Sequence, residues 1–110
     1  MATDFGLKPG DLEMICRILE KEPNIEQALI FGSRAKGNYK PGSDVDIALK
    51  GENLISQVVT DVSFQLNEET IMPYKFDVLN YHTIREPALV AHINSVGIVF
   101  YNKSTNHETI

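Results

Sequence analysis

One stretch, residues 29–49, constrains the fold of this 110-residue chain more than any other. It opens with a short apolar run that predicts a buried strand ending at Gly32. After a polar excursion the chain returns as a second predicted strand, on which Asp44 and Asp46 share one face and apolar side chains occupy the other. Two neighbouring carboxylates beside an apolar face are costly unless a cation lies between them. The pattern therefore predicts a metal site next to a phosphate site.

The length and charge of the chain narrow the class of protein. One domain is expected over residues 1–110, with flexible ends at 1–9 and 103–110. The net charge of −5 argues against a general nucleic-acid binder. The single cysteine, Cys16, cannot form an internal disulfide, and neither a membrane-spanning run nor a signal peptide is recognisable. We therefore expect a cytoplasmic protein that binds neither membranes nor nucleic acid directly.

The hydrophobic periodicity predicts helices and strands in alternation. The order is helix, strand, helical turn, strand, helix, strand, helix, strand, which favours an α/β (α+β) fold with a small mixed sheet flanked by helices. The predicted helical segments run from Asp11 to a break at 22–24, and then over 33–37, 53–67 and 84–96. The predicted strands cover 25–31, 44–50, 74–80 and 98–101.

The turn after the first predicted strand is a candidate phosphate site. Gly32 allows a close approach of the backbone, Ser33 offers a hydroxyl, and the start of a helix favours an anion. A plain strand-to-helix turn with a serine cap is the alternative. Arg34 and Lys36 lie beside this turn and are candidates for neutralising phosphate. For both, solvated surface charge remains open, and Arg34 can also pair with a carboxylate.

Two better-known motifs do not fit. Residues 32–37 match the start of a Walker A loop, but Asn38 and Tyr39 stand where that loop needs Lys and Ser or Thr. An EF-hand beginning at Asp44 needs glycine at its sixth position, which is Leu49 here. The apolar residues between these acids indicate a strand instead.

A third acid strengthens the metal hypothesis. Asp77 interrupts the third predicted strand, where aspartate is disfavoured. If that strand lies beside the second, Asp77 projects from the same face as Asp44 and Asp46, and carboxylates of this kind bind magnesium that holds phosphates. Exposed acids that protect an edge strand are the alternative for the pair Asp44 and Asp46.

Other residues of metal-binding or nucleophilic type are interpreted as structural. Cys16 falls on the apolar face of the first helix and is interpreted as a small core residue. The histidines have no ligand spacing and are interpreted as surface or structural residues: His82, His92 and His107.

With these motifs in place, the chain resembles the nucleotidyltransferase fold of the DNA polymerase beta superfamily, and especially its minimal nucleotidyltransferase (MNT) members. The resemblance implies two Mg²⁺ ions bridging Asp44, Asp46 and the triphosphate of ATP. It implies that Asp77 ligates the catalytic metal or receives the acceptor's proton, and that Ser33 and nearby N–H groups hold the β- and γ-phosphates. A hydroxyl acceptor then takes AMP and pyrophosphate leaves.

The resemblance also implies a partner. Larger members of the superfamily carry a helical domain that builds the acceptor wall, whereas this chain ends just after its predicted sheet, so a partner or a second copy is expected to supply the wall. MNT proteins pair with HEPN-domain proteins in what resembles a toxin–antitoxin module, in which AMP is transferred to a tyrosine of the toxin. Two alternatives stay open: an antitoxin that only binds, and a transferase acting on small molecules such as antibiotics.

Overall fold

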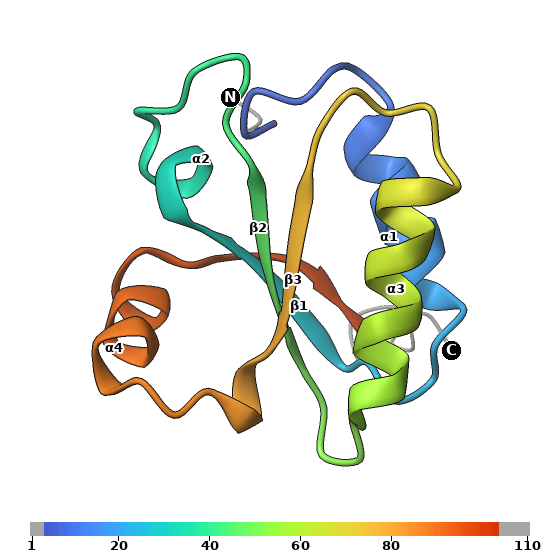
Figure 1. The fold of residues 1–110 in the computed structure, drawn as a ribbon, viewed down its shortest axis with the longest axis vertical. Coiled ribbons are helices and arrows are strands. Elements are labelled where there is room, and N and C mark those ends of the chain that lie inside the picture. The colour runs from blue at the N-terminus through green and yellow to red at the C-terminus, as the bar shows by residue number, and fades with distance from the viewer. Residues whose placement is uncertain (1–3, 104–110) are drawn as a thin grey trace.

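The computed structural model describes residues 4–103 as a four-stranded sheet with helices on both faces (Figure 1). The element order confirms the predicted alternation and adds one turn of 3₁₀-helix, η1. The elements are α1 (Asp11–Glu20), β1 (Gln27–Phe31), α2 (Gly32–Lys36), β2 (Val45–Lys50), α3 (Ser56–Glu68), β3 (Phe76–Asn80), η1 (Tyr81–Thr83), α4 (Pro87–Val96) and β4 (Ile98–Asn102). Within the described residues, no helix has the length and apolarity required to span a bilayer.

The register of the sheet places the acid-bearing strands side by side. The strand order is β3-β2-β1-β4, with β1 antiparallel to β2 and β4, and β2 parallel to β3. Asp46 pairs with Phe31 of β1 on one side and with Asp77 of β3 on the other. Residues in register on adjacent strands project from the same face of a sheet. Asp46 and Asp77 therefore share a face, as predicted.

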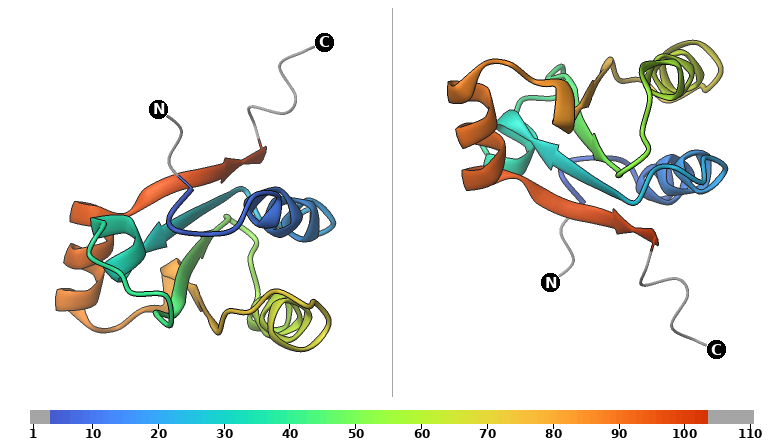
Figure 2. Two further views of the ribbon diagram at one scale, coloured as in Figure 1. Left: turned by 90° about the horizontal axis from the view of Figure 1, so that it is seen from above. Right: turned by 90° about the horizontal axis from the view of Figure 1, so that it is seen from below.

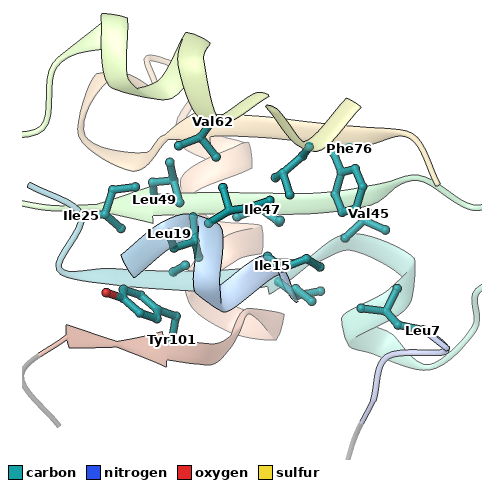
Figure 3. Close-up of a cluster of buried hydrophobic side chains, with 14 of the residues drawn as sticks. Leu7, Ile15, Leu19, Ile25, Val45, Ile47, Leu49, Val62, Phe76 and Tyr101 are labelled. Atoms are coloured by element: carbon teal, nitrogen blue, oxygen red, sulfur yellow. The ribbon is translucent and has the colours of Figure 1, made fainter. Parts of the chain in front are cut away.

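The main core fills the opposite face. Apolar side chains of β2 alternate with the acids and pack under α1 and α3, which lie together on one side of the sheet (Figures 1 and 2). Figure 3 shows this cluster, which includes Ile15, Leu19, Val45, Ile47, Leu49 and Val62. Burial of each such aliphatic side chain contributes about 1.5–3 kcal/mol. This core holds β2 in the register that sends its acids to the other face.

The face that carries the acids is covered by a smaller cluster. Phe31, Ala48 and Ile93 form its centre, and α4 packs over it (Figure 2). Asp46 beside this cluster is half-buried, whereas Asp77 in the edge strand β3 is exposed. The acids thus lie where α4 leaves the sheet open.

The first helix begins at Asp11, as predicted. Its N-cap is Gly10 in a left-handed conformation, and the Asp11 carboxylate accepts a hydrogen bond from the Tyr74 hydroxyl at 2.7 Å. The second long helix begins later than predicted, at Ser56 instead of residue 53, and Ile55 just before it is 57% exposed.

Two side chains of the segment before α1 belong to the main core. Phe5 and Leu7 are each only 4% exposed. The apolar residues in that short segment lack the periodicity that would have indicated packing.

The far end of β4 is also tied to the body of the protein. The main-chain N–H of Lys103 donates to the carbonyl of Glu26 at 2.8 Å, so the predicted flexible end does not include this residue. The predictions for residues 1–3 and 104–110, which include His107, lie outside the described part of the chain.

Candidate active site

Three carboxylates gather at the start of β2 and β3. Asp44 directly precedes β2 and is exposed, and Asp46 is the second residue of that strand. Asp77 is the second residue of β3 and is paired with Asp46 in the parallel ladder. The structure therefore brings together the three acids that the sequence proposed as a set, although they are separated by up to a third of the chain.

The electrostatics of Asp46 reflect this crowding. Burial is the largest cause, and the negative charges of Asp77 and then Asp44 add to it, raising the pKa of Asp46 from 3.8 to about 6. His92 acts in the opposite direction and lowers that pKa. A cluster of this kind favours a bound cation, because a cation removes the repulsion that raises the pKa.

We predict that the contribution of Asp46 to the stability of the metal-free protein is lost as pH rises from below 3.8 to above about 6. In that window the folded state retains a proton on Asp46 that the unfolded chain has lost, so the stabilising contribution is complete below 3.8 and disappears as pH rises through about 6. Urea unfolding in EDTA should show that wild type loses stability relative to Asp46→Asn across this window. A Glu68→Gln variant on α3 is the control, and a pH-independent difference between wild type and Asp46→Asn would contradict the assignment.

Two features of the structure require glycine at position 32: its backbone conformation and the nearby side chain of Asp46. Its φ of +74° lies in the left-handed region, and a Cβ built there would collide with the carboxylate of Asp46. The sequence interpretation gave this space to a ligand, whereas the structure gives it to the Asp46 side chain. The turn after β1 and the acid on β2 are therefore fitted to each other.

Ser33 and Lys36 remain available to a ligand. Ser33 is half-buried, and its hydroxyl has no hydrogen-bond partner within residues 4–103. Its carbonyl accepts the N–H of Gly37 at 2.9 Å, which closes the short helix α2. Lys36 is exposed at the end of α2 and forms no ion pair with the described residues. Both placements are compatible with the predicted phosphate contacts.

The placement of Arg34 contradicts its predicted phosphate contact. The side chain is only 2% exposed, and its guanidinium donates to the main-chain carbonyls of Phe5, Pro41 and Ser43. A guanidinium enclosed in this way is not available to a triphosphate. Within residues 4–103 the alternative of an ion pair with a carboxylate does not hold either, because the hydrogen-bond acceptors are carbonyl oxygens.

The donor set fits magnesium held jointly with phosphate. Among residues 4–103, no three His, Cys, Asp or Glu side chains are positioned to form a metal cage by themselves. Magnesium, however, usually binds through one or two carboxylates together with waters and substrate phosphates. The neighbouring carboxylates of Asp46 and Asp77, with Asp44 close enough to affect the pKa of Asp46, match that mode.

One residue near the acids was not predicted. His92 of α4 lies edge-on to Phe31, with ring centroids 6.1 Å apart, and Phe31 is the cross-strand neighbour of Asp46. Its place next to Ile93, a predicted inward residue of the helix, was the sequence signal that His92 lies near the sheet. The sequence does not, however, indicate which part of the sheet α4 covers. His82, by contrast, accepts the N–H of Gly51 at 3.1 Å, a structural role as interpreted.

Cys16 is a core residue, as the sequence indicated. It is half-buried, packs against the main core, and its Sγ lies 3.7 Å from the carbonyl oxygen of Phe100. Burial, followed by the charges of Glu20 and Glu13, raises the pKa of this thiol. A raised pKa disfavours the thiolate that nucleophilic catalysis needs.

Comparison with known proteins identifies the family. Residues 13–106 match the family model described as "Polymerase beta, Nucleotidyltransferase". The chain belongs to this nucleotidyltransferase family. The resemblance proposed from Gly32, Ser33 and the three acids is thereby confirmed at the level of family and fold.

Individual proteins that resemble this nucleotidyltransferase in sequence or structure agree with the family assignment. It is 27% identical over 84 residues to the "Probable protein adenylyltransferase MntA" of Haemophilus influenzae, an alignment that covers 76% of this chain and 74% of the relative. A toxin–antitoxin crystal structure with AMP-PNP matches with a TM-score of 0.69 at 17% identity, over 88% of this chain and 78% of the other. A tri-AMPylated Shewanella oneidensis HEPN toxin in complex with MNT antitoxin matches with a TM-score of 0.62 at 15% identity, over 87% and 74% of the two chains. These structures share the fold.

Proposed function

We propose that this nucleotidyltransferase transfers AMP from ATP to a tyrosine hydroxyl of a HEPN-type toxin and thereby acts as its antitoxin. The observation that carries the proposal is the pairing of Asp46 with Asp77 on adjacent parallel strands, next to the Gly32 turn. The name of the Haemophilus influenzae relative and the AMPylated toxin held by an MNT antitoxin support the choice of reaction and partner. The absence of any disulfide partner for Cys16 suits the cytoplasm as the place of this reaction.

In this proposal, some residues of the site neutralise charge and others position the triphosphate. Asp46 and Asp77, with Asp44 beside them, would hold Mg²⁺ jointly with the phosphates, and that ion would supply neutralisation of the triphosphate and polarisation of the α-phosphate. Ser33 and the adjacent N–H groups bind the β- and γ-phosphates, and exposed Lys36 adds positive charge at the same end of the site. In this arrangement the protein supplies orientation and electrostatic stabilisation.

The proposed reaction is an in-line transfer of the nucleoside monophosphate. The tyrosine oxygen attacks the α-phosphorus in line, the bond from that phosphorus to the bridging oxygen breaks, and pyrophosphate leaves. The proton of the tyrosine hydroxyl passes to a carboxylate, and we assign this role to Asp77, which is exposed and pairs with Asp46. The product is a tyrosine ester of AMP.

A transfer assay separates this function from its two rivals. The purified protein is incubated with Mg²⁺ and α-labelled ATP, either with its HEPN partner or with a panel of small hydroxyl compounds that includes aminoglycosides. Label on the partner, lost in EDTA, is the expected result. Label on a small compound alone would favour a small-molecule transferase, and a stable complex without label would favour an antitoxin that only binds.

We predict that Ser33→Ala weakens the binding of Mg²⁺·ATP by about 1.5–3 kcal/mol, the value of a hydrogen bond to a charged group. Because the Ser33 hydroxyl has no partner among residues 4–103, this loss is attributable to the ligand and not to the fold. Isothermal titration calorimetry measures the affinity, with Ser56→Ala at the start of α3 as the matched control. An unchanged affinity in Ser33→Ala would place the triphosphate elsewhere.

A further inference from the structure

Arg34 joins two halves of the site through main-chain carbonyls. Its Nε and Nη2 both donate to the carbonyl oxygen of Ser43, at 3.1 and 2.9 Å, and Nη2 also reaches Pro41 at 3.4 Å. Ser43 is the residue immediately before Asp44. Its N–H donates to the carbonyl of Lys40, and its hydroxyl accepts the N–H of Lys40, so the two residues close a turn. The helix that follows Gly32 thus holds the peptide that leads into Asp44.

Two tyrosine rings enclose the same guanidinium. The Arg34 Cζ lies 5.3 Å from the ring centroid of Tyr39 and 5.3 Å from that of Tyr74. Tyr74 stands three residues before Asp77, and its hydroxyl donates to Asp11 while accepting the N–H of Lys8. Cations over aromatic faces are stabilised by the ring quadrupole, and more strongly when water is excluded. Through Tyr74 the guanidinium also contacts the segment that leads into β3.

The N-terminal segment completes this enclosure. Arg34 Nη1 donates to the carbonyl of Phe5 at 2.9 Å, and Phe5 adopts a positive φ of 58°, which is strained for an aromatic residue. Gly6 lies so close to the Tyr39 ring that a Cβ there would collide with it. This segment precedes the part of the chain that matches the family model, which begins at residue 13.

A buried guanidinium that has no carboxylate partner among residues 4–103 requires a structural reason, because leaving water is costly for a charged group. Here the reason is geometric. Carbonyls of two segments, that of Phe5 and that of residues 41–43, accept from one planar fork of donors, which a lysine ammonium cannot reproduce. The fork thus joins the N-terminal segment to the peptide that leads into Asp44, and the Tyr74 ring adds a contact with the segment that leads into Asp77.

We infer that Arg34 is a positioning residue for the nucleotidyl transfer: by binding the Ser43 carbonyl and stacking between Tyr39 and Tyr74, it holds Asp44 and Asp77 in register with Asp46. The inference rests on the proposed function for its kinetic consequence. Its structural content, the coupling of the segments before the two acids through one side chain, stands independently of the reaction.

The test compares Arg34→Lys with variants matched for charge and for stability. Arg85→Lys makes the same exchange at an exposed arginine, and Leu66→Ala destabilises the core under α3 without touching the site. At a temperature where circular dichroism shows every variant folded, Arg34→Lys should transfer AMP about tenfold to a hundredfold more slowly and need more Mg²⁺ for half-maximal rate. Leu66→Ala and Arg85→Lys should remain within about twofold of wild type. An equal loss in Leu66→Ala, or a wild-type rate in Arg34→Lys, would overturn the inference.

A spectroscopic readout keeps the inference separate from the proposed function. In ¹⁵N-labelled Arg34→Lys, the amide signals of Asp44 and Asp77 should both shift, while those of α3 stay in place. If wild type transfers no AMP, the proposed function fails and these shifts alone decide the inference. If Arg34→Lys does not fold, Tyr39→Leu replaces it and should shift the same two signals, whereas Tyr39→Phe, which keeps the ring, should not. Unmoved signals at Asp44 and Asp77 would contradict the coupling.

Discussion

Replacing Asp77 by asparagine should slow AMP transfer by about 10²–10⁴-fold, the range assigned to a lost general base, and leave the fold intact. Asp77 is exposed in an edge strand, so its side chain contributes little to packing. The amide keeps the shape of the side chain but cannot accept the tyrosine proton and offers no negative charge to a cation. Initial rates of label transfer measure the effect, and thermal unfolding by circular dichroism checks the fold.

The control for Asp77→Asn is Asp61→Asn on α3, which lies on the opposite side of the sheet. That variant should transfer AMP at the wild-type rate. A wild-type rate in Asp77→Asn would mean that another carboxylate receives the proton, and the pairing with Asp46 would lose its assigned function.

Gly32→Ala should abolish measurable transfer, because it damages the backbone and the acid at the same time. The new Cβ requires the Asp46 carboxylate to move, and the left-handed φ of Gly32 costs a non-glycine residue about 1–2 kcal/mol. A displaced carboxylate misplaces whatever cation and phosphate it holds, which by itself costs about 10²-fold. Transfer rates and urea unfolding measure the two effects separately.

Gly37→Ala is the matched control for this variant. Gly37 ends α2 with a φ of +87°, but nothing lies within 4 Å of a Cβ built there. It therefore carries the same backbone cost without the collision, and should lose similar stability while it retains transfer. If Gly32→Ala and Gly37→Ala lost activity equally, backbone strain and not the fit between Gly32 and Asp46 would explain the glycine.

The arrangement of the acids could be predicted because it follows from two simple periodicities. Alternation along the second strand sends Asp44 and Asp46 away from the core, and an aspartate inside an apolar strand marked Asp77 as a third candidate, on the condition that β3 lies next to β2. The structure supplies that pairing. The helix of Gly32–Lys36 was likewise predictable, since a glycine and a serine end the apolar run of β1. These signals are local, and each depends on residues within a few positions of one another.

What could not be predicted depends on contacts between distant segments. Arg34 looked like a phosphate ligand because it follows Ser33, and only the folded chain shows its partners at Phe5 and Ser43. The same holds for His92, whose place beside Phe31 depends on where α4 crosses the sheet. A periodicity states which face of an element is buried, but not against which residues.

The intact mass of the HEPN partner, purified after co-expression with this protein, tests the central claim most directly. Co-expression with wild type should add adenylate to the partner, and co-expression with Asp44→Asn combined with Asp46→Asn should add none, although both proteins still form the complex. An unmodified partner with wild type, or an adenylated partner with the double variant, would contradict the account of these carboxylates as the transferase centre.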